Sequence, residues 1–270
     1  MNNRRYNLFF FLADFSFGGA GKSITKLCSS LSKKKYQIHV ICLSKCFYKN
    51  DLKKAGVDVI EINESKVSFA FFKFREIIKK NLNKEYVNII ISNIHYVNIF
   101  TYLSTIGLNN FKLIFCERTS LKELKIYFNK IDFIKKCIIR FLIPFIYNKA
   151  DVLITNSLSV KKSLEKKIFK RKIFLNYSPT LSKIEKNKNF KINRNKLKIL
   201  YTGRFSREKN VDCILKAMKI LNFDYELWLI GNGKRKEHLV KLSKKLNIRK
   251  KVKFINFTND LKKYYKKSDI

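Results

Sequence analysis

Glycine, lysine and serine residues near the start of the chain could bind phosphate. The stretch DFSFGGAGKSITKL, residues 14–27, follows the apolar run NLFFF. A P-loop also joins a strand to a helix, but its motif is G-x-x-x-x-G-K-[ST]. Ser16 stands where that motif needs its first glycine, and Phe17 stands where the variant KGGxGKS has lysine. A P-loop ATPase using Gly21–Ser23 is therefore an alternative that rests on a weak motif.

A second group of basic residues lies in the last third of the chain. In ILYTGRFSREKNVDCILKA, Gly203 and Arg204 end an apolar run, and Lys209 and Asn210 precede a helical pattern. Ligands of open α/β sheets bind at the carboxyl ends of strands, where a guanidinium can hold two phosphate oxygens. The amides at a helix N-terminus also attract anions. The pattern predicts a phosphate site, with a solvated basic loop as the alternative.

Apolar runs that alternate with amphipathic helices predict the elements that hold these residues. Continuous apolar strands of this kind are typical of a parallel sheet covered on both faces. Strands are expected at 7–11, 37–44, 57–62, 87–92, 112–117, 151–157, 172–175, 196–203, 225–231 and 251–257. Helices are expected around 24–31 and at 69–82, 131–150, 159–167, 210–221 and 234–247.

The apolar periodicity stops in one polar segment. It is lost from Tyr177 to Asn195, in YSPTLSKIEKNKNFKINRN, as expected of a linker between domains. We therefore predict an N-terminal domain at 1–178, a linker at 179–195 and a partial C-terminal domain at 196–270.

Motifs in both domains resemble those of the family 4 glycosyltransferases. In the first domain the stretches GGAGKS, ERTS, NKADVLITNS and KIFLNYSP are similar to the family's acceptor domain. In the second domain the matching residues are Gly203, Arg204, Lys209, Asn210, Gly231 and Gly233. The resemblance implies the GT-B architecture, an α/β fold of two Rossmann-like domains with parallel sheets, the second incomplete here.

The resemblance also implies an activity. Such an enzyme moves a sugar from a nucleotide-sugar donor to a glycan or lipid-linked acceptor, retains the anomeric configuration and needs neither a metal nor another cofactor. Cell-envelope polysaccharide synthesis, such as that of lipopolysaccharide, is the expected pathway. Fixed positive charge is needed where the departing diphosphate gains negative charge. Arg204 and Lys209 are therefore predicted to be catalytic, together with Glu117.

Donor contacts are predicted at glycine loops and at the basic segment. Glycines let backbone amides approach a ligand closely, although Gly18 and Gly19 could also form only a tight turn between strand and helix. The predicted donor-binding residues are Gly18, Gly19, Gly203, Arg204, Lys209, Asn210, Gly231 and Gly233.

Three residues of the first domain are candidates for contact with the transferred sugar or the acceptor. Glu117 and Arg118 follow the strand KLIFC, where relatives often have histidine; an ion pair between the two is the alternative. His95 follows another apolar strand and is the one histidine expected in the cleft. His39 lies in a predicted strand and His238 in a predicted helix, so both are expected to be structural.

The composition limits the possible partners and location. The formal net charge of +39 favours polyanions, but the lysines are spread along the whole chain, so nucleic acid is not expected. No window reaches the ~18 apolar residues of a membrane span, and a cytoplasmic protein with buried free thiols is expected. The helix in FIKKCIIRFLIPFIY mixes basic with bulky apolar residues, which suggests peripheral binding to an anionic membrane. Core packing would explain its apolar side equally well.

The family's Glu-x7-Glu pair has no counterpart before Ser268-Asp269-Ile270. Two interpretations follow for the 270 residues of this sequence. They are part of an active glycosyltransferase, or they form a non-catalytic remnant or a subunit that needs a partner.

Overall fold

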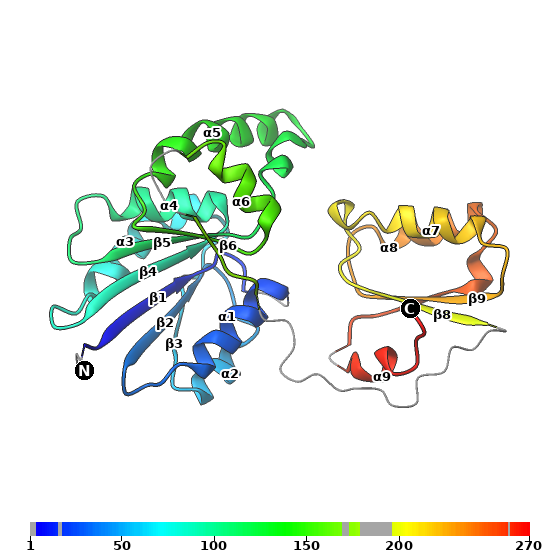
Figure 1. Ribbon diagram of the computed structural model, residues 1–270, viewed down its shortest axis with the longest axis horizontal. Helices are drawn as coiled ribbons and strands as arrows, with labels where there is room; N and C mark the ends of the chain where they lie inside the picture. Colours follow the sequence, from blue (N-terminus) through cyan, green and yellow to red (C-terminus); the bar gives the residue numbers. More distant parts are fainter. Residues whose placement is uncertain (1–3, 16–17, 169–172, 179–195, 259) are drawn as a thin grey trace. The chain divides into compact units, whose positions relative to one another are not determined.

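The chain forms two compact units, Met1–Lys183 and Ile184–Ile270 (Figure 1). The computed structural model describes residues 4–15, 18–168, 173–178, 196–258 and 260–270. The predicted linker at 179–195 lies outside these residues. Each unit is built around a parallel β-sheet, which confirms the predicted α/β class.

A seven-stranded parallel sheet forms the centre of the first unit. Its order, β3-β2-β1-β4-β5-β6-β7, reverses direction between β1 and β4. Open α/β sheets bind ligands at such a switch point, outside the carboxyl ends of the strands. The strands are β1 (Tyr6–Phe11), β2 (Tyr36–Cys42), β3 (Asp58–Glu61), β4 (Val87–Asn93), β5 (Lys112–Glu117), β6 (Val152–Thr155) and β7 (Ile173–Leu175).

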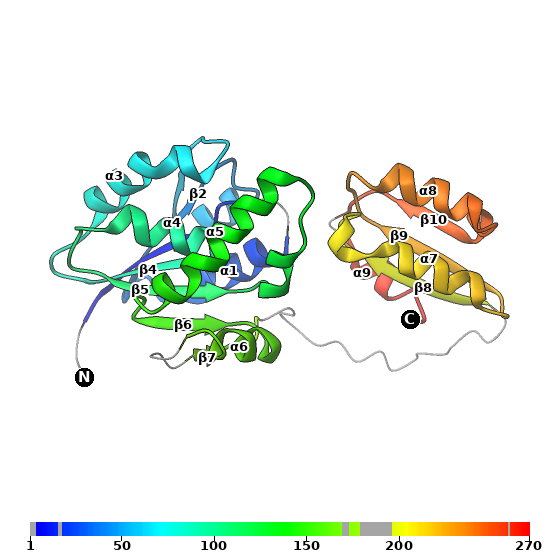
Figure 2. The same ribbon diagram turned by 90° about the horizontal axis from the view of Figure 1, so that it is seen from above.

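Helices cover both faces of this sheet (Figures 1 and 2). One apolar core joins the sheet to the helices α3 to α6, and a second joins its other face to α1 and α2. Alternate residues of β1 divide between them, since Phe9 and Phe11 belong to the first core and Leu8 and Phe10 to the second. The helices are α1 (Gly19–Ser30), α2 (Lys49–Lys54), α3 (Phe71–Asn81), α4 (His95–Thr105), α5 (Lys130–Tyr147) and α6 (Leu158–Glu165), with short 3-10 helices η1 (Val67–Ala70) and η2 (Leu121–Lys125).

Two of these helices were not predicted. Helix α2 has only 6 residues, too few for a clear apolar period. Helix α4 has 11 residues, and 8 of them are buried. A helix buried on nearly every side has no polar face, so the alternation that reveals an amphipathic helix is missing.

The second unit contains a three-stranded parallel sheet in the order β10-β9-β8. Helices α7 and α8 share an apolar core on one face, and α9 lies on the other face (Figure 1). There the ring of Tyr264 meets Trp228 edge to face, with centroids 5.7 Å apart. The elements are β8 (Leu197–Thr202), η3 (Arg207–Lys209), α7 (Val211–Ile220), β9 (Tyr225–Ile230), α8 (Lys236–Lys245), η4 (Arg249–Lys251), β10 (Val252–Ile255) and α9 (Lys262–Tyr265).

The last residues of the chain pair with the outer side of β8. The amide of Leu200 donates to the carbonyl of Ile270, and the amide of Asp269 donates to Lys198. The carboxylate of Asp269 accepts from the Lys198 amide at 2.8 Å. This edge of the sheet is therefore hydrogen-bonded, as an edge strand requires if it is not to remain open to other chains.

The six cysteines are free thiols, but only half of them are buried. Cys28, Cys42 and Cys46 are buried, as predicted, whereas Cys116 and Cys137 are half-buried. The prediction is wrong for Cys213, which is exposed because it lies on the outer side of α7. Across the described residues, no helix combines the length and the apolar character needed to cross a membrane.

Candidate active site

The carboxyl ends of β1, β4 and β5 bring together the predicted site residues of the first unit. Gly18 and Gly19 follow β1 and begin α1. His95 is the first residue of α4, directly after β4. Glu117 is the last residue of β5, and Arg118 follows it. These residues therefore flank the switch point of the sheet, where ligand binding is expected.

The glycine loop after β1 leads directly into a helix. Gly18 is the N-cap of α1 and has no side chain to cap it, and the first turn carries no acidic residue. A Cβ atom on Gly19 would meet nothing within 4 Å. Because the helix begins at Gly19 and the Lys22 amide already donates to the Gly18 carbonyl at 3.0 Å, residues 21–23 lie within a helix. The P-loop alternative would need the Lys22 amide to bind a phosphate, but this amide is already hydrogen-bonded within the helix.

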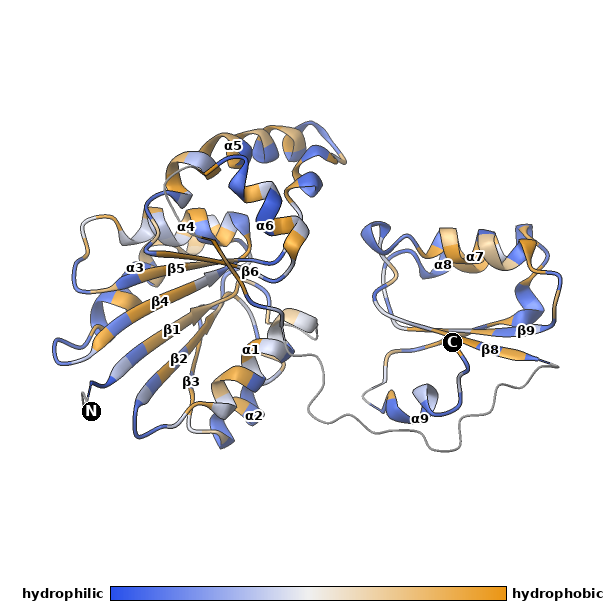
Figure 3. Cartoon of the chain, viewed as in Figure 1, coloured by the Kyte–Doolittle hydropathy of each residue, from blue (hydrophilic) through white to orange (hydrophobic). Residues whose placement is uncertain are grey.

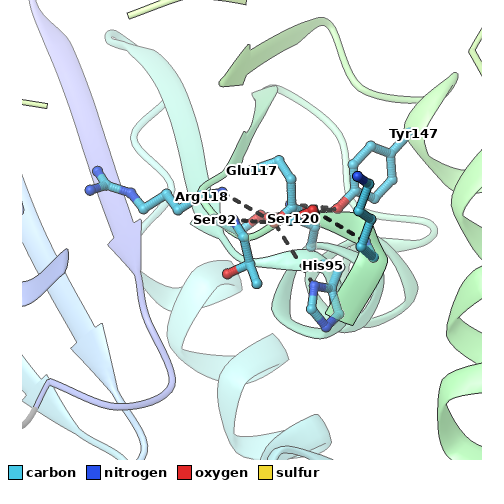
Figure 4. Close-up of polar contacts among 9 residues, drawn as sticks. Ser92, His95, Glu117, Arg118, Ser120 and Tyr147 are labelled. Carbon is cyan, nitrogen blue, oxygen red and sulfur yellow. Dashed lines mark hydrogen bonds and ion pairs between the residues drawn. The ribbon is translucent and has the colours of Figure 1, made fainter. Parts of the chain in front are cut away.

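The carboxylate of Glu117 is enclosed by hydrogen-bond donors (Figure 4). Glu117 is only 1% exposed. One of its oxygens accepts from the amides of Arg118 and Thr119, both at 3.1 Å. The other accepts from the hydroxyl of Tyr147 at 2.6 Å. In this arrangement the carboxylate does not reach a substrate, which argues against direct chemistry by Glu117.

The hydroxyl of Tyr147 connects this carboxylate to a buried chain of polar groups. Tyr147 accepts from the Asn98 amide at 3.0 Å, and Asn98 in turn accepts from the Ser92 hydroxyl at 2.7 Å. All of these side chains are buried. Burial and the neighbouring Glu117 carboxylate raise the pKa of Tyr147 well above its ordinary range. The chain links β4, α4, β5 and α5, so it fixes the elements that carry the site.

His95 lies beside the Glu117 carboxylate (Figure 4). Its Nδ1 atom is 3.8 Å from the nearer carboxylate oxygen, too far for a hydrogen bond. That nitrogen is buried and has no hydrogen-bond partner among the described residues. The other two histidines each contact an aspartate, His39 at 3.0 Å and His238 at 2.7 Å. His95 is thus the histidine that the fold places at the switch point.

The residue before His95 has an unusual backbone. Ile94 has φ +77° and ψ +143°, and positive φ is rare for a β-branched residue. Its amide donates to the carbonyl of Cys116 at 2.9 Å, which ties this turn to the end of β5. Strained backbone of this kind clusters at functional sites, where the surrounding structure holds it in place.

Arg118 extends away from Glu117 toward the end of β1 (Figure 4). Its Nε donates to Asn93 at 2.9 Å, and its Nη1 donates to the Ser178 hydroxyl at 3.3 Å. Asn93 donates in turn to the carbonyl of Phe11 at 3.3 Å. Burial lowers the pKa of the Arg118 guanidinium. The alternative of an ion pair between Glu117 and Arg118 is wrong. The Arg118 guanidinium donates to neutral groups, and both carboxylate oxygens of Glu117 accept hydrogen bonds from other donors.

The basic residues of the second unit lie at the carboxyl end of β8. The side chains of Arg204 and Lys209 are exposed. Arg204 is 3.6 Å from the Glu208 carboxylate, and such exposed pairs contribute little. Asn210 has φ +46° and ψ +44° and joins η3 to α7, a left-handed conformation that asparagine tolerates well. The structure thus places both cations on a turn before a helix, as predicted.

Gly231 and Gly233 let two loops pack backbone against backbone. Their φ angles are +152° and +158°, and an added Cβ would overlap the carbonyl of Gly203 or of Phe205. The Phe205 amide donates to the carbonyl of Asn232 at 2.9 Å. This packing gives both glycines a structural role that needs no ligand. Their contact with a donor stays a prediction.

A metal-binding site is not found in the described part of the chain. Within those residues, no group of three or more histidine, cysteine, aspartate or glutamate side chains could hold a metal ion.

Solved structures of other proteins share this fold. The Anabaena Alr3699/HepE protein in complex with UDP-glucose matches with a TM-score of 0.67 and 14% identity, over 94% of this chain and 70% of that one. WaaG, a glycosyltransferase involved in lipopolysaccharide biosynthesis, matches with a TM-score of 0.64 and 15% identity, over 95% and 72%. These likenesses confirm the predicted GT-B fold.

Curated relatives match almost the whole chain. A Campylobacter jejuni protein named N-acetylgalactosamine-N,N'-diacetylbacillosaminyl-diphospho-undecaprenol 4-alpha-N-acetylgalactosaminyltransferase is 24% identical, over 96% of this chain and 72% of its own length. An uncharacterized glycosyltransferase of Haemophilus influenzae is 26% identical, over 97% and 72%.

Family comparisons cover both units. Residues 182–270 match the glycosyl transferases group 1 family, and residues 22–157 match the glycosyl transferase 4-like family. None of these matches supports the ATPase alternative, and together they identify a glycosyltransferase. The chain belongs to the glycosyl transferase 4-like family.

Proposed function

We propose that this protein transfers a sugar from a nucleotide-sugar donor to a glycan or lipid-linked acceptor during synthesis of cell-envelope polysaccharide. The observation that carries the proposal is the placement of Arg204 and Lys209 at the carboxyl end of β8, before α7, in a chain of this family. Two cations and a helix N-terminus form a site suited to a diphosphate.

The relatives indicate the classes of donor and acceptor. The Anabaena structure holds UDP-glucose, and the Campylobacter relative is named for transfer to a diphospho-undecaprenol acceptor. A nucleoside diphosphate sugar and an acceptor with a free sugar hydroxyl agree with both.

In the reaction proposed, the bond between the anomeric carbon and the diphosphate oxygen breaks while the acceptor oxygen bonds to the same carbon. The acceptor attacks from the face that the diphosphate leaves, so the anomeric configuration is retained, and its proton passes to a phosphate oxygen. Arg204 and Lys209 stabilise the negative charge that grows on the diphosphate. Because the pair between Arg204 and Glu208 is exposed and 3.6 Å long, the guanidinium can turn to a phosphate at little cost.

The first unit contributes contacts with the sugar and the acceptor. We assign these contacts to His95 and Arg118, which flank the switch point. We assign donor contacts to the backbone of Gly18 and Gly19 at the start of α1; the open space around Gly19 leaves room for close approach of a ligand. Glu117 is 1% exposed, so we assign it a positioning role: it holds Tyr147 and the turn that follows β5.

The experiment is an assay of donor turnover with a panel of radiolabelled nucleotide sugars. Arg204→Ala is expected to lower turnover about a hundredfold or more, while Arg249→Ala, in η4 of the same unit, leaves it unchanged. Competition should come from UDP or another nucleoside diphosphate and not from ATP. Binding of a donor without any turnover would favour the non-catalytic alternative, and equal turnover by Arg204→Ala would contradict the assigned role.

A further inference from the structure

Two cysteines lie close together at the carboxyl end of β2, outside the contacts assigned to the proposed reaction. Cys42 is the last residue of β2, and Cys46 lies in the turn between β2 and α2. Both are free thiols, 0% and 6% exposed, and both belong to the core that α1 and α2 cover. We call Cys42 and Cys46 the thiol pair.

The backbone and one glutamate bring the thiol pair together. Glu61 on β3 is the register partner of Cys42, and its carboxylate accepts from the Cys46 amide at 2.8 Å. Inside the turn, the Cys42 thiol donates to the Ser44 carbonyl at 3.1 Å. The two thiols are within hydrogen-bonding reach of each other. Two cysteines held this close are in the arrangement that a disulfide needs.

The two thiols differ in how readily they ionise. The hydrogen bond with Cys42 lowers the pKa of Cys46, while the same bond and burial raise the pKa of Cys42. The ammonium group of Lys49, which donates to Glu61 at 2.6 Å, also favours the Cys46 thiolate. Because the thiolate is the nucleophile in thiol chemistry, Cys46 is suited to attack and Cys42 to resolve.

The turn around Cys46 is accessible from solvent. Its neighbours Ser44, Lys45 and Phe47 are exposed. Helix α2, which follows the turn, has 6 residues with Leu52 as its buried one, and Figure 3 shows this helix as mainly hydrophilic. A segment with few buried apolar contacts opens locally at low cost in free energy. A small reagent can therefore reach Cys46 without unfolding the sheet.

The same turn holds the segment that leads into the glycine loop. The Leu43 amide donates to the Ala13 carbonyl at 3.2 Å, and the Phe47 amide donates to the Phe15 carbonyl at 3.0 Å. Both acceptors lie between β1 and α1. A disulfide holds its two Cβ atoms about 3.8 Å apart and replaces the hydrogen bonds that the thiols donate. Closing it therefore changes the turn that makes these two bonds.

We propose that the thiol pair forms a reversible disulfide that alters the turn beside the glycine loop. The oxidant is a low-molecular-weight disulfide. The Cys46 thiolate attacks one sulfur of this reagent, the reagent's S–S bond breaks, and the first reagent thiol leaves with the proton from Cys46. The Cys42 thiol then attacks the Cys46 sulfur, and the second reagent thiol leaves with the proton from Cys42.

The electrons balance in this exchange. The protein's two thiols are oxidised to one disulfide, and the reagent's disulfide is reduced to two thiols. The exchange needs neither a sugar donor nor an acceptor, so it goes beyond the proposed sugar transfer and is tested apart from it.

The test incubates the full chain with oxidised and reduced glutathione in graded ratios, alkylates the remaining thiols and maps the peptides by mass spectrometry. Trypsin cleaves after Lys45, between the two cysteines, so their peptides stay joined only when a disulfide links them. We expect this linked species in the parent and its loss when dithiothreitol is added. Cys28 is the internal control, because burial raises its pKa to about 12. It should react at least about tenfold more slowly than Cys46.

Two variants and a second readout separate the steps. Cys42→Ser removes the resolving thiol and should leave glutathione attached to Cys46, whereas Cys46→Ser should leave Cys42 reduced. Amide exchange followed by NMR reports on the turn. The Leu43 and Phe47 amides should exchange about threefold or more faster in the oxidised parent, and their exchange should not change in Cys46→Ser treated in the same way.

The proposal makes outcomes that would overturn it easy to recognise. One is that the thiol pair stays reduced while the exposed Cys213 takes up glutathione. Another is oxidation of Cys28 as fast as that of Cys46, which would show reaction through unfolding. Unchanged exchange of the Leu43 and Phe47 amides in the linked species would contradict the effect on the turn.

Discussion

Replacing Tyr147 with phenylalanine removes one hydroxyl from the buried polar chain beside the candidate site. That hydroxyl donates to Glu117 at 2.6 Å and accepts from Asn98 at 3.0 Å. The ring itself is fully buried against Phe115, so phenylalanine keeps the packing. The substitution leaves a buried carboxylate oxygen and a buried amide without this partner.

The expected loss follows from the groups involved. A hydrogen bond to a charged group contributes about 1.5–3 kcal/mol, and an unsatisfied buried polar group costs roughly 1–3 kcal/mol. Both ranges include the loss of the same bond, so they are not simply added. We expect the free energy of unfolding of the first unit to fall by about 2–4 kcal/mol. Tyr127→Phe is the control, because Tyr127 is 42% exposed; a change below ~0.5 kcal/mol is expected there.

Urea unfolding can separate the two units. Trp228 lies on β9, so its fluorescence follows the second unit, while far-ultraviolet circular dichroism follows both. Tyr147→Phe should move the circular dichroism transition to lower urea and leave the Trp228 transition in place. A loss below about 1 kcal/mol, smaller than the cost of an unsatisfied buried polar group, would refute the argument that this hydroxyl satisfies a buried carboxylate.

Other substitutions test the glycine loops and an acidic contact. In Gly231→Ala the new Cβ would overlap the Gly203 carbonyl, so the urea transition of Trp228 should move strongly to lower urea. Gly19→Ala has open space around its Cβ, so this variant should fold normally. It should lose donor turnover only if a ligand approaches Gly19. The amide of Cys46 and the side chain of Lys49 lower the pKa of Glu61 in the folded protein. The stabilisation that these two contacts give to the folded state is therefore present above about pH 4.3, and it is lost as pH falls through the lower folded pKa of Glu61. Glu61→Gln should therefore be less stable than the parent at neutral pH in urea titrations, and the difference should shrink on acidification; a constant difference would contradict this.

Much of the fold could be predicted because its strands are buried on both faces. Segments such as 87–92 and 112–117 are continuous apolar runs, and these correspond to β4 (Val87–Asn93) and β5 (Lys112–Glu117). Helix α4 escaped prediction for the same physical reason, since it is too buried to show a polar face. Local pattern therefore revealed the buried strands and the helices with one exposed side, and it missed a helix that is buried on nearly every side.

The sequence predicted which residues of the candidate site lie at strand ends, but not the contacts that they make with distant residues. Placing His95 and Glu117 after strands was enough to bring them to one edge of the sheet. The contact of Glu117 with Tyr147 joins residues 30 positions apart, and Tyr147 lies in a helix whose sequence pattern is dominated by apolar residues. Nothing local indicates that this hydroxyl, and not Arg118, would satisfy the carboxylate.

Binding of a nucleoside diphosphate to the second unit is the most direct test of the proposed diphosphate site. Calorimetric titration with UDP, with GDP and ADP as further probes, should compare the parent with Lys209→Ala and with Lys219→Ala, an exposed lysine at the other end of α7. A lost hydrogen bond to a charged group corresponds to roughly tenfold to hundredfold in affinity. We expect this loss for Lys209→Ala and not for Lys219→Ala. Equal affinities of the two variants, or no binding of any nucleoside diphosphate by the parent, would contradict it.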